Sequence, residues 1–139
     1  EGGLDVVKSN KIMREGISQL KKTGIRVSLF IDPDEAQIKA SQDIGADEIE
    51  LHTGCYANKI VALEQDKEYN RLLKASELAH NHKLKINAGH GLNYLNTNRI
   101  CSLPNLRELN IGHSIISRAI FVGITQAVKE MREIIIFNS

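Results

Sequence analysis

Short apolar segments alternate with amphipathic segments along this chain, and the alternation limits its possible folds more than any other feature. The apolar segments have the length and composition of buried strands. The strands predicted from them are Val27–Ile31, Glu48–His52, Leu84–Asn87 and Glu108–Ile111. Strands that alternate with helices form a parallel sheet covered by those helices. The sequence therefore predicts an α/β fold built on a parallel sheet.

The segments between these strands have the spacing of helices. Met13, Ile17 and Leu20 share one helical face, and Gly24 is placed to end that helix. After the first strand, Asp32 is predicted to cap the next helix, with Pro33 in its first turn. The capping role accounts for Asp32, so no catalytic role is assigned to it.

Longer helices are predicted in the second half of the chain. One runs from Asp66 to Asn81, and the segment before it, Cys55–Gln65, is long enough to hold additional structure. A short helix is expected before Pro104. Near the C-terminus a single long helix is predicted, and the residues on one of its faces are Ile116, Ile120, Ile124, Val128 and Met131.

Two α/β architectures are compatible with this pattern. A small open, doubly wound sheet would be complete at about this length. A (β/α)8 barrel typically needs about 250 residues, so the 139 residues of this chain would make about half of one. Periodicity does not distinguish the two, and length alone favours the open sheet.

The composition excludes several classes of function. The 18 basic and 17 acidic residues nearly balance, which gives no electrostatic case for a nucleic-acid or membrane-surface partner. No apolar run approaches the roughly 20 residues that cross a bilayer. Cys55 and Cys101 match no zinc-site spacing, so no metal is expected. They are predicted to be reduced thiols in a cytoplasmic protein, with a disulfide as the minor alternative.

Polar residues collect where the predicted strands end. The four ends read FIDPD, IELHTG, NAGHGL and NIGHSI, and histidine stands at or just beyond three of them. Ligands of parallel α/β folds bind at this edge of the sheet. In the second strand, Glu48, Glu50 and His52 share the face opposite to the apolar one. A carboxylate on a buried face must be paired or hydrogen-bonded, which makes Glu50 a candidate functional residue. The alternative is an edge strand with one face exposed to water.

Two further candidates follow the last two strands. His90 lies between glycines, which allow close approach of a ligand, and imidazole exchanges protons near neutral pH. A loop histidine that only satisfies backbone groups is the alternative. Gly112-His113-Ser114 opens a helix, where free N–H groups favour an anion such as phosphate. The alternative there is an ordinary glycine turn with Ser114 as the helix cap.

The motifs EGGLDV, VSLFIDPDEAQIKA, IELHTGCYA, INAGHGLNY and ELNIGHSIISRAI, taken together and in this order, resemble the pyridoxine 5′-phosphate synthase family. The resemblance covers residues 1 to about 131. It implies that the four strands are the fifth to eighth of a (β/α)8 TIM barrel. Residues 1–139 would then be the C-terminal half of a single barrel domain whose N-terminal half is absent from this chain.

The resemblance also implies a reaction. The family condenses 1-deoxy-D-xylulose 5-phosphate with 3-amino-2-oxopropyl phosphate to give pyridoxine 5′-phosphate, phosphate and water, without a metal or organic cofactor. His90 would be the proton donor and Glu50 the carboxylate that stabilises a transition state. Gly91, Gly112 and His113 would contact substrate, the last two around a phosphate.

The same resemblance suggests partners and limits. The expected partners are phosphorylated small molecules and further copies of the chain in a homo-oligomer. A histidine and a glutamate that act as bases belong to the absent half, so the chain alone is not expected to catalyse the reaction. A non-catalytic phosphate-binding α/β module is the alternative function. The roles of His52 and Cys55 stay open.

Overall fold

The computed structural model describes residues 2–138, which form an α/β structure on a four-stranded parallel sheet. The strands are β1 (Ser28–Ile31), β2 (Glu48–His52), β3 (Lys85–Gly89) and β4 (Leu106–Asn110). Their spatial order is β1-β2-β3-β4, the same as their order along the chain, so this sheet contains no switch point. All four strands lie at or within two residues of their predicted positions.

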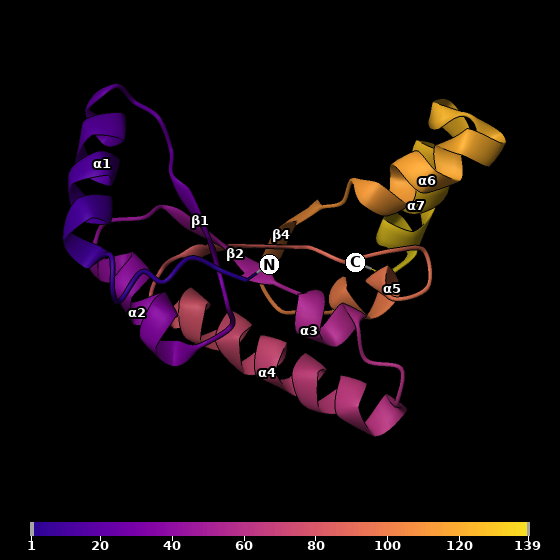
Figure 1. Cartoon of the computed structure of the whole chain (residues 1–139), viewed down its shortest axis with the longest axis horizontal. Helices are drawn as coiled ribbons and strands as arrows, with labels where there is room; N and C mark the ends of the chain where they lie inside the picture. The colour runs from indigo at the N-terminus through magenta and orange to yellow at the C-terminus, as the bar shows by residue number, and fades with distance from the viewer. Residues whose placement is uncertain (1, 139) are drawn as a thin grey trace.

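Helices follow each strand (Figure 1). The helices are α1 (Asn10–Lys22), α2 (Glu35–Asp43), α3 (Gly54–Ala57), α4 (Ala62–Asn81), α5 (Thr97–Ile100), α6 (His113–Val122) and α7 (Ile124–Asn138). The single-turn α3 is the additional structure expected around the start of Cys55–Gln65. Gly24 has a φ of +81° just beyond α1, which confirms its predicted role in ending that helix. None of the helices in residues 2–138 has the length and apolar character needed to span a membrane.

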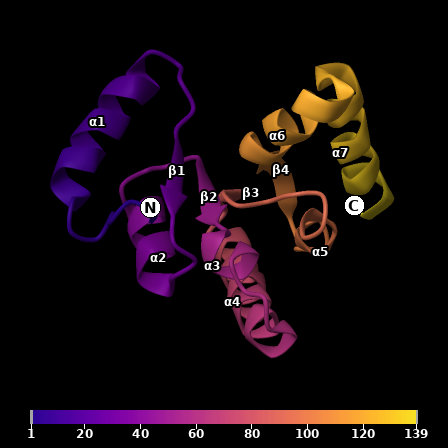
Figure 2. The ribbon, with the colours of Figure 1, turned by 45° about the vertical axis from the view of Figure 1, so that its right-hand side comes forward.

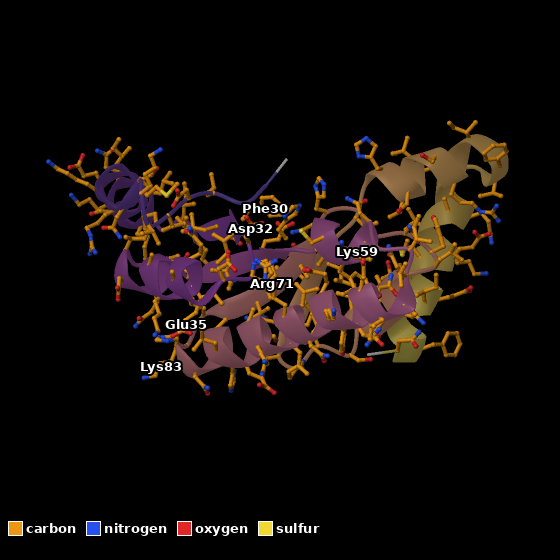
Figure 3. The ribbon with its side chains drawn as sticks, turned by 60° about the horizontal axis from the view of Figure 1, so that its bottom comes forward. Phe30, Asp32, Glu35, Lys59, Arg71 and Lys83 are labelled. Atoms are coloured by element: carbon orange, nitrogen blue, oxygen red, sulfur yellow. The ribbon has the colours of Figure 1, made fainter. Side chains whose placement is uncertain are left out.

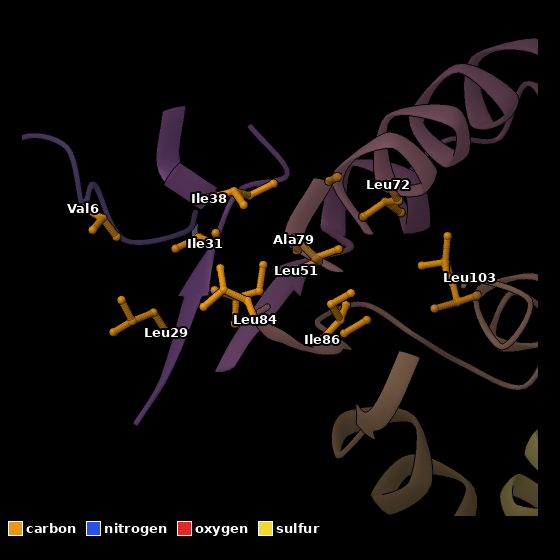
Figure 4. Close-up of a cluster of buried hydrophobic side chains, with 14 of the residues drawn as sticks. Val6, Leu29, Ile31, Ile38, Leu51, Leu72, Ala79, Leu84, Ile86 and Leu103 are labelled. Atoms are coloured by element: carbon orange, nitrogen blue, oxygen red, sulfur yellow. The ribbon is translucent and has the colours of Figure 1, made fainter. Parts of the chain in front are cut away.

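The core lies between one face of the sheet and helices α2 and α4 (Figure 4). Alternation along the strands places Ile31, Leu51 and Ile86 on this face, each fully buried. They pack in the same cluster as Ile38 of α2 and Leu72 of α4. Figure 2 shows α2 and α4 on one side of the strands, with no helix of the described residues covering the other side between α1 and α6. The polar strand residues face that open side.

The prediction of one long C-terminal helix is wrong. Gly123 has a φ of +78°, a conformation that L side chains rarely adopt, and it separates α6 from α7. The two helices pack on each other, and Arg118 Nε lies 2.8 Å from Glu130 Oε2 across the pair. Of the predicted apolar face, Met131 is buried, while Ile116 and Ile120 are exposed.

The prediction that Asp32 caps a helix is also wrong. Helix α2 begins at Glu35 with Asp34 in the extended N-cap position, and no side chain caps it. The backbone carbonyl of Asp32 instead accepts a hydrogen bond from the N–H of Asp34 at 2.7 Å, which forms a tight turn before the helix. This turn leaves the Asp32 side chain free to point toward the neighbouring strand.

Candidate functional site

The carboxyl ends of the four strands bring the polar candidates to one edge of the sheet. The register pairs Phe30 with Glu50, Glu50 with Asn87, and His52 with Gly89. Because these strands are parallel, the residues that follow them emerge at the same edge of the sheet. Two of those residues are His90, directly after β3, and His113, at the start of α6.

Glu50 is half-buried on the open face of β2, and its carboxylate is held by a residue of β4. The Asn110 side-chain amide donates a hydrogen bond from Nδ2 to Glu50 Oε2 at 2.7 Å. The other carboxylate oxygen lies over Gly89, where an added Cβ would stand 2.2 Å from Glu50 Oε1. The carboxylate is therefore fixed between β3 and β4, as expected for a partly buried charge that must be paired.

Gly89→Ala is expected to displace this carboxylate and to lower the free energy of unfolding by about 1–3 kcal/mol through overpacking. In a chain that already carries Glu50→Ala, the same change is expected to cost about 1 kcal/mol less, because the Oε1 contact is gone. Urea unfolding of the four chains measures this coupling. Gly16→Ala is the matched control, since an added Cβ there meets nothing within 4 Å. Equal costs in both backgrounds would contradict the proposed contact.

The backbone at His90 adopts an uncommon conformation. His90 has a φ of +80° and Gly91 a φ of +75°, so two successive residues lie in the left-handed region. The backbone N–H of Thr53 donates to the carbonyl of Gly89 at 2.9 Å. The Thr53 hydroxyl lies 2.7 Å from that oxygen and 2.6 Å from the carbonyl oxygen of His90, and it shares its hydrogen between them. These bonds hold the His90 turn, and such strain is often retained at functional sites.

A cavity of about 490 Å³ lies between the turn after β3 and the start of α6. Its lining includes four of the five predicted site residues, which are His90, Gly91, Gly112 and His113. Glu50 is not part of the lining, but Asn110, which holds its carboxylate, is. A larger cavity of about 760 Å³ opens at the amino ends of the strands. Parallel α/β folds do not bind ligands at that end, so the smaller cavity is the candidate site.

The start of α6 has the features of an anion site. Gly112 is the N-cap residue, and no side chain caps the helix. The alternative in which Ser114 serves as that cap is wrong, because its hydroxyl donates to the carbonyl of Leu92 at 2.8 Å. First-turn N–H groups without a side-chain cap carry the positive end of the helix dipole. A phosphate in the cavity would meet these groups.

Asp32 and His52 form a contact that the sequence did not predict. His52 Nδ1 lies 2.8 Å from Asp32 Oδ1, and the imidazole is only 7% exposed. Partial burial acts to raise the pKa of Asp32, but hydrogen bonds from His52 and from the Gly3 N–H outweigh it, and the pKa falls below its usual value. Figure 3 shows Asp32 beside Phe30 and near Arg71. The signal for this pair was the acidic residue directly after a strand, which the cap motif obscured.

Metal binding finds no geometric support in the described part of the chain. Across residues 2–138, no group of three or more His, Cys, Asp or Glu side chains is placed to hold a metal ion. Cys55 is exposed and Cys101 is buried, and the two are not joined by a disulfide. The minor alternative of a disulfide is therefore wrong.

The family described as "Pyridoxal phosphate biosynthesis protein PdxJ" matches residues 1–136. The chain belongs to this family. Its similar curated relatives include a pyridoxine 5′-phosphate synthase from Blochmanniella pennsylvanica (strain BPEN), 50% identical over 135 residues, and one from Sulfurihydrogenibium sp. (strain YO3AOP1), 51% identical over 136 residues. The matches cover 97% and 98% of this chain but 55% and 56% of the relatives.

The PdxJ match confirms the resemblance seen in the sequence motifs, and it includes Glu1, which lies outside the described residues. The chain spans just over half the length of the relatives it matches. The individual roles of His90, Glu50, Gly91, Gly112 and His113 remain predictions from that resemblance and from the geometry above.

Proposed function

We propose that this chain is the C-terminal half of a (β/α)8 barrel and that the complete barrel is a pyridoxine 5′-phosphate synthase. The consecutive order of four parallel strands supports a barrel over a doubly wound sheet, which has a switch point. Helices on one side of the sheet and polar strand residues on the other agree with this arrangement. In such a barrel, β1 to β4 are strands five to eight.

The proposed reaction joins 1-deoxy-D-xylulose 5-phosphate to 3-amino-2-oxopropyl phosphate and releases phosphate and water. The observation that carries the proposal is the single cavity lined by His90, Gly91, Gly112 and His113. His90 donates a proton to the reacting molecule, and Glu50 stabilises positive charge that develops in the transition state. Gly91 allows close approach, while Gly112 and His113 hold a substrate phosphate at the start of α6.

The chemistry fits a site of this kind. Joining an amine to a ketone and closing a ring needs repeated proton transfers around one anchored intermediate. The phosphate at α6 supplies the anchor, and the imidazole of His90 supplies a proton near neutral pH. A closed barrel mouth would keep bulk water from imine-like intermediates.

The remaining parts of the proposal concern what lies around the chain. The other half of the barrel supplies a histidine and a glutamate that act as bases, so residues 1–139 alone do not turn over substrate. The complete protein binds phosphorylated small molecules, assembles as a homo-oligomer and works in the cytoplasm.

Fusing the complementary N-terminal part of the Blochmanniella synthase to this chain tests the proposal. The fused protein is expected to form pyridoxine 5′-phosphate from the two substrates, because this chain is 50% identical to the part of that relative which it would replace. Product formation is measured by chromatography and phosphate release. The relative's N-terminal part alone and this chain alone serve as controls.

Two results would contradict the proposal. One is a folded fusion that makes no product under conditions in which the intact relative does. The other is turnover by the 139-residue chain without its complement.

A further inference from the structure

The proposed reaction leaves one buried imidazole at the sheet edge unused. His52 ends β2, and its Nδ1 contacts a carboxylate of Asp32 that also accepts a hydrogen bond from the Gly3 N–H at 3.3 Å. A carboxylate only accepts hydrogen bonds, so Nδ1 of His52 carries the hydrogen. In the neutral ring, Nε2 is then a lone-pair acceptor. Within residues 2–138 that buried Nε2 has no hydrogen-bond partner.

The ring of His52 lies directly against the ring of His90. Their centroids are 4.7 Å apart, with the planes at 69°. The ring of His52 also contacts the ring of Phe30, with their centroids 5.1 Å apart and their planes at 69°. Such edge-to-face contacts restrict the orientation of both partners. Phe30 also lies near His90, with centroids 6.3 Å apart, so the three rings form one cluster in which His52 contacts both of the others.

Gly54 makes this close approach possible. An added Cβ at position 54 would stand 2.6 Å from His52 Nε2 and 2.9 Å from His90 Cδ2. Any other residue there would push the two imidazoles apart. The contact between the two rings thus depends on the absence of a side chain at the start of α3.

We infer that Asp32 and His52 form a positioning pair for His90. Asp32 fixes the tautomer and plane of His52, and the ring of His52 fixes the side chain of His90 facing the cavity. The inference rests on the proposed function, in which His90 is the proton donor. A carboxylate that orients one imidazole is a common device for holding catalytic or ligating histidines. Here Asp32 orients the ring of His52, and that ring in turn orients the ring of His90.

The first test reads the tautomer of His52 without using activity. Two-bond ¹H–¹⁵N spectra of the 139-residue chain are expected to show His52 protonated at Nδ1. Asp32→Ala is expected to release that tautomer toward a mixture, whereas Asp34→Asn is expected to leave it unchanged. Asp34 is the matched control, because it follows the same strand but pairs with Arg71. Asp32→Leu keeps the side-chain bulk without an acceptor and replaces the alanine variant if that chain does not fold.

The second test reads the effect on His90 in the fused barrel. Asp32→Ala and Gly54→Ala are each expected to lower kcat by about 10- to 100-fold, the size seen when outer partners of functional histidines are removed, with KM changed less than about twofold. Gly54→Ala should do so while His52 keeps its Nδ1–H tautomer. Asp34→Asn should match the unmodified fusion.

The two tests separate failure of this inference from failure of the proposed function. If the unmodified fusion is inactive, the proposed function is contradicted. The spectra of the 139-residue chain still test the Asp32–His52 pair in that case. His52 protonated at Nε2, or a tautomer indifferent to Asp32→Ala and Asp32→Leu, overturns the pair. A changed tautomer with an unchanged kcat overturns its positioning role.

Discussion

Replacing His90 with alanine in the fused barrel is expected to reduce kcat by about 10²- to 10⁴-fold, the contribution typical of a positioned general acid. The affinity for inorganic phosphate is expected to stay within about threefold of its original value, because the start of α6 remains intact. Steady-state kinetics and a calorimetric phosphate titration measure the two quantities. A loss of turnover with retained phosphate binding would separate the proton-transfer role of His90 from anchoring of the substrate.

The conformation of His90 requires a second variant. Its φ of +80° is unfavourable for alanine but better tolerated by asparagine, so His90→Asn guards against a purely structural loss. His80→Ala is the matched control, because His80 is an exposed histidine at the end of α4, near the amino ends of β3 and β4 and not part of the candidate cavity. Full activity in both His90 variants would remove this residue from the mechanism. An inactive fusion that binds phosphate equally well in every variant would favour the non-catalytic phosphate-binding module.

Ile86→Ala is expected to lower the free energy of unfolding by about 2–5 kcal/mol. Ile86 is the second residue of β3 and is fully buried, and its side chain lies in the layer between the sheet and the helices. The loss combines the transfer energy of the removed methyl groups with the cost of the cavity they leave. Urea unfolding of the fused barrel, followed by circular dichroism, gives the difference.

The control for this change is Ile60→Ala. Ile60 is 98% exposed, so its truncation is expected to change the free energy of unfolding by less than about 0.5 kcal/mol. A similar dependence on urea in all three proteins would show that the unfolded states are comparable. A cost at Ile86 no larger than that at Ile60 would mean that the two faces of β3 are assigned incorrectly.

The strands and the layout of the sheet edge could be predicted because they depend on local patterns. In β2, Ile49 and Leu51 alternate with Glu50, which is enough to predict which face packs on helices. Once the strands are parallel, their ends must share one edge. The sequence pattern therefore predicts that His90 and His113 lie close together, and both line the same cavity.

The features that escaped prediction depend on contacts distant in sequence or on one residue's backbone. Asp32 satisfied a local cap motif, but its partner His52 lies 20 residues away on another strand. Asn110 reaches Glu50 across 60 residues, which no spacing rule suggests. A glycine inside a helix lowers helix stability by only about 1 kcal/mol relative to alanine. The apolar periodicity on both sides of Gly123 was therefore a stronger signal for one continuous helix than the glycine was for a break. In the structure, α6 and α7 pack on each other across that break.

The alternation along β2 also limits which length changes this protein can tolerate. A single inserted or deleted residue within Glu48–His52 would turn the glutamate and histidine toward the helix layer and expose the aliphatic side chains. The chemistry and the core would be lost together. Insertions that arise during evolution, or that are engineered to carry a tag or a label, are therefore best placed in the connection between α3 and α4, where Ile60 is already surrounded by solvent.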